Sequence, residues 1–254
     1  MEQSVTNYAV YTEKEFRANS KLIYPVDLRG GMWAKFMQED PISNKYWSEF
    51  HEIYDEFQLY IAEGNRFIAR IKSLPIRFDG DLLELPLQGW DWVIENSIDI
   101  YHKGIEPNMV SAIEITFLPE YRGQGLSTVA LNLMKLNAKR HGFDTLLAPV
   151  RPNQKHQFPL IPMQDYITWR RADGLLYDAW LRVHERAGGE IIRVASESMR
   201  IPGTKADWET WTGLDFPATG DYIVPQALNP IHMDIEANQA VYIEPNVWIL
   251  HRIS

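Results

Sequence analysis

The pattern of apolar and polar positions predicts a helix and then two strands in the first third of the chain. Asp40 and Pro41 have the form of a helix start, an N-cap residue followed by proline at the first helical position. Apolar residues then recur at helical spacing as far as Phe57. We further expect strands at 58–62 and 66–72, joined by a hairpin turn, and a short helix near 90–97.

The middle of the chain alternates between strand and helix patterns. Residues 110–118 predict a strand with Ile113, Ile115 and Phe117 on one face. A turn with two glycines then opens an apolar-striped helix that should end at Gly142. The elements expected next are a strand at 144–150, a helix at 177–187 and a strand at 190–195. This order predicts a mixed α/β sheet with helices packed on it.

The last quarter is less regular in its pattern. From 196 onward we expect only a short helix near 207–211 and strands at 241–243 and 247–253. Trp208 and Trp211, one helical turn apart, are expected to pack in a core or a lid. A chain of 254 residues is compatible with one large fold. We therefore interpret 1–254 as a single domain with a core at about 58–195, strands that return near 241–253, and additions at about 1–39 and 196–240.

Composition and charge narrow the class of protein. Apolar residues make up 45% and charged residues 23%, which is typical of a soluble globular chain. Asp and Glu outnumber Lys and Arg by 34 to 25, and a net charge of −9 weighs against a nucleic-acid partner. The absence of cysteine excludes a thiolate nucleophile and a cysteine-ligated metal. Met1 to Val5 do not resemble a secretory signal and no apolar run could span a membrane, so we expect a cytoplasmic protein.

The most specific chemistry lies at 117–127, where a strand ends and a helix begins. A turn with Gly123 and Gly125 exposes backbone N–H groups that, with the helix dipole, form an anion site. Arg122 adds a fixed positive charge beside it. Neither a Rossmann glycine fingerprint nor a P-loop is present. From these residues alone, a plain strand–helix turn stays open as the alternative.

The segment Pro119-Glu120-Tyr121-Arg122-Gly123-Gln124-Gly125-Leu126-Ser127 resembles the acyl-CoA-binding motif of the GNAT superfamily of N-acyltransferases. Arg122 and Gly125 match that motif, and the order of elements over about 58–195 is similar. The resemblance implies a GNAT-type α/β fold with a mixed, mostly antiparallel central sheet and helices on both faces. It implies that the pyrophosphate of coenzyme A binds the amides of Gly123, Gln124, Gly125, Leu126 and Ser127. The pantetheine arm would pair with the backbone of Phe117 and Leu118.

The catalytic candidates follow from the resemblance together with the chemistry. Acyl transfer to an amine needs a base for the ammonium and an acid for the departing thiolate. Glu114 lies on the motif strand, on the face opposite Ile113, and is the candidate base. The alternative is a salt-bridged strand carboxylate.

For the acid, the family usually offers a tyrosine four residues before a glycine–aromatic pair. Counting back from Gly188 gives His184 instead, and Gly189 replaces the aromatic residue. A histidine can donate a proton at neutral pH. Tyr177, seven residues earlier on the same expected helix, is the second candidate, about 10 Å away. A histidine that only packs stays open as the alternative for His184.

The resemblance implies an acyl-CoA-dependent N-acyltransferase, most simply one that moves acetyl from acetyl-CoA to a small amine in a ternary complex, without a metal. The departures at His184 and Gly189 leave open a non-catalytic acyl-CoA-binding sensor or partner-binding module. The negative net charge would suit a cationic amine, and a homodimer is left open. Weaker candidates are His232, Asp234 and Glu236 for a metal, and Arg151, Lys155, Lys139 and Arg140 for the adenosine phosphates or as surface charges.

Overall fold

A computed structural model describes residues 8–28 and 33–253, and its strands form one nine-stranded sheet. The strand order is β1-β2-β3-β4-β5-β9-β8-β7, with β6 also paired to β9. Of the pairings between these described strands, β4–β5 is parallel and the others are antiparallel. The strands are β1 (Tyr8–Thr12), β2 (Gln58–Glu63), β3 (Arg66–Ile76), β4 (Met109–Phe117), β5 (Thr145–Val150), β6 (Glu190–Gly203), β7 (Gly220–Tyr222), β8 (Ile231–Asp234) and β9 (Gln239–Arg252).

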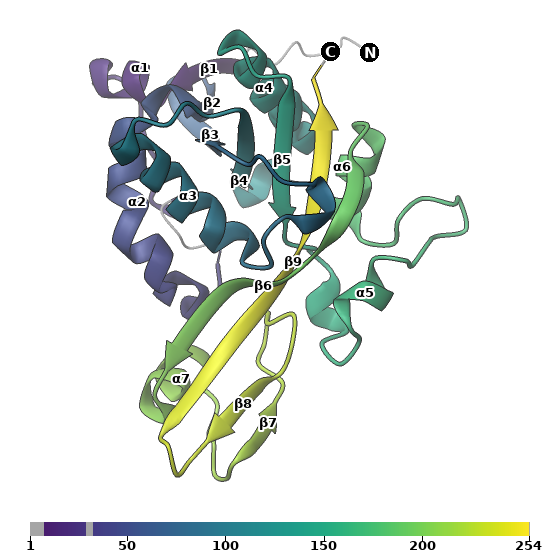
Figure 1. Ribbon diagram of the computed structural model, residues 1–254. Coiled ribbons are helices and arrows are strands. Elements are labelled where there is room, and N and C mark those ends of the chain that lie inside the picture. The colour runs from purple at the N-terminus through teal and green to yellow at the C-terminus, as the bar shows by residue number, and fades with distance from the viewer. Residues whose placement is uncertain (1–7, 29–32, 254) are drawn as a thin grey trace, which may run out of the picture.

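Helices cover both faces of this sheet, as the sequence predicts (Figure 1). The helices are α1 (Glu13–Ala18), α2 (Pro41–Ile53), α3 (Gly89–Lys103), α4 (Leu126–Arg140), α5 (Met163–Tyr166), α6 (Ala179–Arg186) and α7 (Lys205–Thr212). On one face α2 and α3 pack against Leu147 of β5 and Trp248 of β9. On the other face α4 and α6 pack against the alternate residues Leu146 and Ile249. The mixed, mostly antiparallel GNAT-type arrangement is therefore confirmed.

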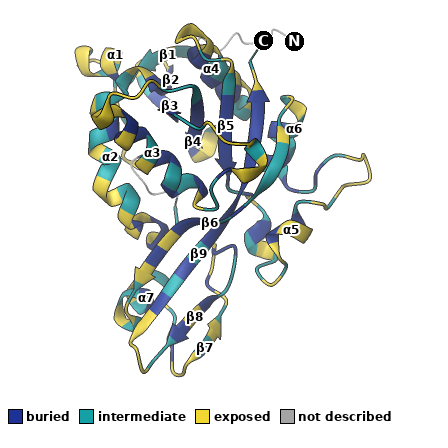
Figure 2. Ribbon diagram, viewed as in Figure 1, coloured by how far each residue is buried: buried dark blue, intermediate teal, exposed yellow. Residues whose placement is uncertain are grey.

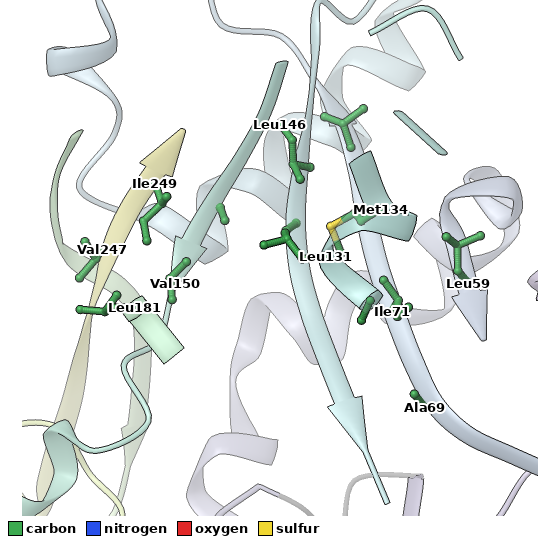
Figure 3. Packing of buried hydrophobic residues seen from close by; sticks show 14 of the residues in the cluster. Leu59, Ala69, Ile71, Leu131, Met134, Leu146, Val150, Leu181, Val247 and Ile249 are labelled. Carbon is green, nitrogen blue, oxygen red and sulfur yellow. The ribbon is translucent and has the colours of Figure 1, made fainter. Parts of the chain in front are cut away.

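The central strands are buried because both of their faces carry apolar side chains. Figure 2 shows β3, β4, β5 and β9 as mostly buried. In Figure 3, Leu131 and Met134 of α4 lie beside Leu146 of β5 and Ile71 of β3. This packing fixes the position of α4, and therefore of the turn that precedes it, against the sheet.

Most elements of the first 195 residues lie where the sequence predicts them. The carboxylate of Asp40 caps α2 by accepting a hydrogen bond from the amide of Ser43 at 2.6 Å. That helix ends at Ile53 rather than Phe57, and a short 3-10 turn at Asp55–Phe57 follows it. The helix expected near 90–97 is longer than predicted and runs as α3 to Lys103.

The C-terminal quarter is the main correction to the sequence prediction. Residues after 195 are not irregular, because β6 continues to Gly203 and the two predicted strands after 240 are one continuous strand, β9. Pro245 breaks the strand pattern in the sequence, but it lies opposite the irregularity in β6 between Ala195 and Met199.

The far halves of β6 and β9, with α7, β7 and β8, extend from the main body as an antiparallel arm (Figure 1). We call residues 199–244 the C-terminal arm. Its core also includes Phe36 and Met37 from the N-terminal part of the chain, and Trp208 packs there on Phe36 and on Trp211. Trp208 and Trp211 are therefore packing residues, as expected.

None of the helices in the described part of the chain is long and apolar enough to cross a membrane. Met1 to Val5, the segment compared with a secretory signal, lie outside the described residues. The cytoplasmic location and the homodimer stay predictions from the sequence.

Candidate active site

A cavity of about 740 Å³ opens between β4 and β5. The two strands pair only at Val110 with Leu146 and at Ser111 with Leu147, near the start of each strand. Beyond these positions their facing residues line the cavity, 112–117 on β4 and 148–150 on β5. A gap between splayed parallel strands leaves backbone groups on both sides without a strand partner, which is what an extended ligand arm can use.

The turn before α4 borders this cavity. Gly123 and Gly125 adopt positive φ angles of 75° and 77°, a conformation that glycine takes without penalty. Arg122 N donates to Pro119 O and Thr128 N donates to Gly125 O. Between these two amides, five successive N–H groups find no backbone acceptor among the described residues, as expected at a helix start. The turn therefore has the free donors that an anion site needs.

The residues predicted to hold the coenzyme divide into two groups. The cavity is lined by Phe117, Arg122, Gly123, Leu126 and Ser127. Gln124, whose side chain donates to Glu120 O at 2.8 Å, and Gly125 lie in the turn behind them. Leu118 is fully buried and its amide donates to Ile68 O at 2.9 Å, so that amide is not available to a pantetheine arm.

Glu114 lies on β4 inside the cavity and is 7% exposed. Its Oε1 atom accepts from Arg70 Nε at 2.9 Å, from Arg70 Nη2 at 2.6 Å and from Thr116 Oγ1 at 2.7 Å. Trp33 Nε1 approaches the same oxygen at 3.4 Å. The other oxygen, Oε2, is buried and has no hydrogen-bond partner in the described structure. One oxygen therefore fixes the carboxylate, and the other is a buried acceptor whose hydrogen-bonding capacity the described residues do not use.

A second buried charge lies next to this pair. Lys72 on β3 is the cross-strand neighbour of Glu114 and is 1% exposed. Its Nζ atom has no hydrogen-bond partner among the described residues and lies over the rings of Trp47 at 5.7 Å and Tyr60 at 5.3 Å. Burial lowers the pKa of the Lys72 ammonium to about 7. Glu114 therefore has a buried ionisable neighbour that the sequence pattern did not reveal.

His184 on α6 lines the cavity and is 2% exposed. Its Nδ1 atom lies 2.9 Å from Nε2 of His251 on β9. Burial, followed by the effects of His251 and Lys135, lowers the pKa of His184 to about 3. The expectation of an ordinary histidine pKa is therefore corrected, because a group with this pKa is uncharged at neutral pH.

Comparisons with known proteins address the fold first. No family model matches the chain. The loading GNATL domain of CurA from Lyngbya majuscula gives a TM-score of 0.59 over 97% of this chain and 98% of its own, at 18% identity. The GphF GNAT-like decarboxylase, solved in complex with isobutyryl-CoA, gives a TM-score of 0.51 over 98% and 100%, at 10% identity. At these identities the two structures show a shared fold.

A curated relative decides the family. Arginine N-acetyltransferase avaD from Aspergillus versicolor is 31% identical over 260 residues, which cover 91% of this chain and 89% of the relative. The chain belongs to the GNAT superfamily. It is an N-acetyltransferase, so we set aside the alternative of a non-catalytic sensor.

The departure of this GNAT enzyme at Gly189 has a steric explanation. A Cβ atom at Gly189 would lie 2.6 Å from Cε1 of His251 and 2.8 Å from the carbonyl oxygen of His184. A side chain at this position would therefore clash with the His251 ring and with the backbone of α6.

Tyr177 is not on the helix that carries His184. That helix, α6, begins at Ala179, with Asp178 as its N-cap. Tyr177 packs against Phe158 and Trp169, with ring centres 5.9 and 5.7 Å away, and is not among the residues that line the cavity. The prediction that both candidate acids share one helix is therefore wrong in this respect.

The β9 side of the cavity was not found from the sequence. Arg151, just after β5, donates from Nε to both oxygens of Glu244 on β9, at 3.0 and 2.9 Å. Trp33 and Asn246 line the same side. These residues are far apart in the chain, and no local motif joins them. The sequence predicts Arg151 only as a ligand of the adenosine phosphates or as a surface charge.

The weaker candidates are scattered. His232 pairs with Asp221 at 2.6 Å on the surface, while Asp234 ends β8 and Glu236 follows it in a turn. No group of three possible metal ligands occurs in the parts of the chain that the structure describes. Lys139 and Arg140 lie in the last turn of α4, at the opposite end from the glycine turn. Lys155 is buried and donates to the carbonyls of Phe158 and Leu228.

Proposed function

We propose that this enzyme transfers an acetyl group from acetyl-CoA to a primary amine of a small acceptor, by direct attack in a ternary complex. The observation that carries the proposal is one continuous cavity, bordered by the amide-rich turn at Gly123 and by the buried carboxylate of Glu114. The relative from Aspergillus versicolor is named for arginine, so arginine is the first acceptor to test. The GphF structure holds an acyl-CoA on the same fold.

On this proposal the turn holds the coenzyme. The amides of Gly123 to Ser127 bind the pyrophosphate, and Arg122 adds positive charge next to it. The pantetheine arm lies between β4 and β5, where these two strands no longer pair with each other, and contacts Phe117 rather than the amide of Leu118. The thioester then lies along the same strand as Glu114.

Glu114 is the proposed base. Arg70 and Thr116 hold Oε1, so the unpartnered Oε2 atom is the one that accepts a proton from the acceptor ammonium, directly or through water. The neutral amine then attacks the thioester carbon, a C–N bond forms and the C–S bond breaks. The second proton leaves the nitrogen as the amide forms and neutralises the thiolate. The products are the N-acetyl amine, coenzyme A and one released proton.

Neither candidate acid is well suited to deliver that second proton. Because the pKa of His184 is low, its ring is a neutral imidazole at neutral pH and lacks the acidic proton of an imidazolium. A neutral imidazole can still donate a hydrogen bond. Tyr177 packs in an aromatic cluster outside the cavity lining. We therefore infer that the thiolate takes the proton lost by the attacking nitrogen, with His184 as a hydrogen-bonding neighbour.

A two-part experiment tests the proposal. Acetyl-CoA at 100 times its dissociation constant should stabilise the native protein by about 2.7 kcal/mol, seen as a rise in melting temperature. Free thiol release should then depend on an added amine, and mass spectrometry should detect the acetylated product. No stabilisation by acetyl-CoA would contradict the coenzyme site. Stabilisation without acetylation of any small amine would contradict the acceptor class.

A further inference from the structure

The β9 side of the cavity is built around a fixed arginine. Glu244 is fully buried, and both of its oxygens accept from Arg151 Nε. Tyr242 donates its hydroxyl to Oε2 at 3.1 Å, and Asn246 donates Nδ2 to Oε1 at 3.2 Å. The carboxylate is therefore saturated by protein donors, so that it orients Arg151 and is not itself free to bind a cationic ligand.

Arg151 still has donors left over. Its Nη2 atom donates to Gln226 O at 2.6 Å, and Trp33 lies over the guanidinium with its ring centre 5.9 Å from Cζ. A guanidinium carries five N–H donors; Nη1 makes none of the hydrogen bonds given above, and the hydroxyl of Tyr242 also interacts with the guanidinium. Since Arg151 lines the cavity and its side chain is 17% exposed, a ligand can reach this edge.

The charges around the cavity favour a ligand with a negative group. The charged Arg and Glu side chains among its described lining residues are Arg70, Arg122, Arg151, Glu114 and Glu244. Each of the two carboxylates is paired with an arginine, so neither is an uncompensated negative charge, although the chain as a whole carries −9. A simple cationic amine would use the free Oε2 of Glu114 but nothing at Arg151.

We propose that Arg151 forms a carboxylate subsite, and that the acceptor of this enzyme is an amino acid rather than a simple amine. An amino acid matches both free groups, with its carboxylate on the Nη1 edge of Arg151 and its reacting amine toward Oε2 of Glu114. The inference rests on the proposed acetyl transfer and adds the class of acceptor to it.

The test uses acceptor pairs that differ only in a carboxylate: arginine and agmatine, lysine and cadaverine, histidine and histamine, tryptophan and tryptamine. We expect the amino acid of the best pair to have a kcat/KM about 10- to 100-fold above that of its amine, as one charge-assisted contact would give. Arg151→Gln should remove this preference by lowering kcat/KM for the amino acid alone. Arg151→Lys should restore part of it.

Arg193→Gln is the matched control, because Arg193 on β6 donates to Leu83 O outside the cavity lining. It should leave the preference unchanged. Equal use of both members of every pair would overturn the subsite while leaving acetyl transfer intact. If Arg151→Gln lowered kcat/KM equally for both members of a pair, Arg151 would have a structural role. If it weakened the affinity for acetyl-CoA, Arg151 would bind the coenzyme phosphates. Either result would overturn the subsite.

Calorimetry separates this inference from the proposed function. Each pair is titrated into the protein loaded with coenzyme A, so that binding is measured without turnover. Tighter binding of the amino acid, lost in Arg151→Gln, supports the subsite even if no pair is acetylated, in which case the proposed function fails. Equal binding of amino acid and amine, or binding of neither, overturns the subsite.

Discussion

The two sides of the cavity differ in how the chain builds them. On the β4 side, the part that we assign to the coenzyme comes from eleven consecutive residues, 117–127, and presents mostly backbone amides, while Glu114 is the acidic side chain of this side. The β9 side comes from Trp33, Arg151, Glu244 and Asn246, and presents side chains. A site made of backbone needs only a local conformation, so glycine spacing can predict it. A site made of side chains depends on tertiary contacts between segments that carry no shared motif.

Sequence separation makes the contrast concrete. Gly123 and Gly125 set the turn by their own positive φ angles. Arg151 and its partner Glu244 are 93 positions apart, and they meet because β5 and β9 are neighbours in the sheet. The predictions below separate the two sides by asking which substrate each one serves.

The largest expected effect is at Glu114. Glu114→Gln keeps the shape of the side chain but removes its proton affinity, so kcat should fall about 10²- to 10⁴-fold. The affinity for acetyl-CoA, measured by calorimetry, should stay the same, because Glu114 is not part of the turn. Glu120→Gln, an exposed residue paired with Arg66, is the control and should keep wild-type turnover. Full activity of Glu114→Gln on a verified acceptor would show that Glu114 is not the general base.

A smaller effect is expected on the β4 side. Gly123→Ala and Gly125→Ala should weaken acetyl-CoA binding about 10- to 100-fold, because a methyl group there takes the space of the approaching pyrophosphate. A Cβ atom at either position meets no protein atom within 4 Å, so that space is open to a ligand. Neither variant should change the preference between amino acid and amine acceptors.

Gly142→Ala is a matched control for these two variants. Gly142 follows α4 at the end opposite the turn, has a φ of 87°, and its Cβ would likewise meet nothing within 4 Å. All three substitutions therefore strain the backbone similarly, and their melting temperatures should fall by similar amounts. If Gly142→Ala weakens acetyl-CoA binding as much as the others, backbone strain and not the turn explains the loss.

The sequence predicted well those features that depend on neighbouring residues. Asp40 caps α2 as expected, and the apolar stripe of α4 packs on the sheet. The continuity of β9 could not be predicted, because Pro245 normally marks the end of a strand. In the structure Pro245 lies opposite the irregularity in β6, and the strand continues through it. The state of His184 could not be predicted either, since its low pKa follows from burial and from His251, which is 67 positions away.

A third prediction concerns Lys72 on β3, the buried cross-strand neighbour of Glu114. Burial lowers the pKa of Lys72 in the native state to about 7 from the ordinary 10.5, so between these values the unfolded chain binds more protons. The contribution of Lys72 to stability therefore increases as pH rises from 7 toward 10.5. Lys72→Met removes a poorly solvated charge and should raise the free energy of unfolding at pH 7 by about 1–2 kcal/mol.

Urea denaturation at pH 7, 8 and 9 measures this effect. The stability advantage of Lys72→Met over the wild type should shrink as pH increases, because the wild-type ammonium loses its proton. Lys103→Met, at an exposed lysine paired with Asp99, should show no such trend with pH. A constant difference between Lys72→Met and wild type would mean that Lys72 is fully charged in the native state.

The smallest effect is expected at His184, which is hydrogen-bonded to His251 of β9. Because the pKa of His184 is about 3, its ring keeps one charge state from pH 6 to 9. His184→Gln should therefore leave the shape of the pH dependence of kcat/KM unchanged and alter turnover by less than about tenfold, as expected for losing a hydrogen bond but not a general acid.

Tyr177→Phe, in the aromatic cluster outside the cavity lining, should leave turnover unchanged. If His184→Gln removed the fall of kcat/KM at high pH, His184 would be the general acid. If only Tyr177→Phe caused a large loss of turnover, Tyr177 would have that role. Melting temperatures of both variants exclude unfolding as the cause, and the first of these results would show that a residue paired with β9 takes part in the chemistry.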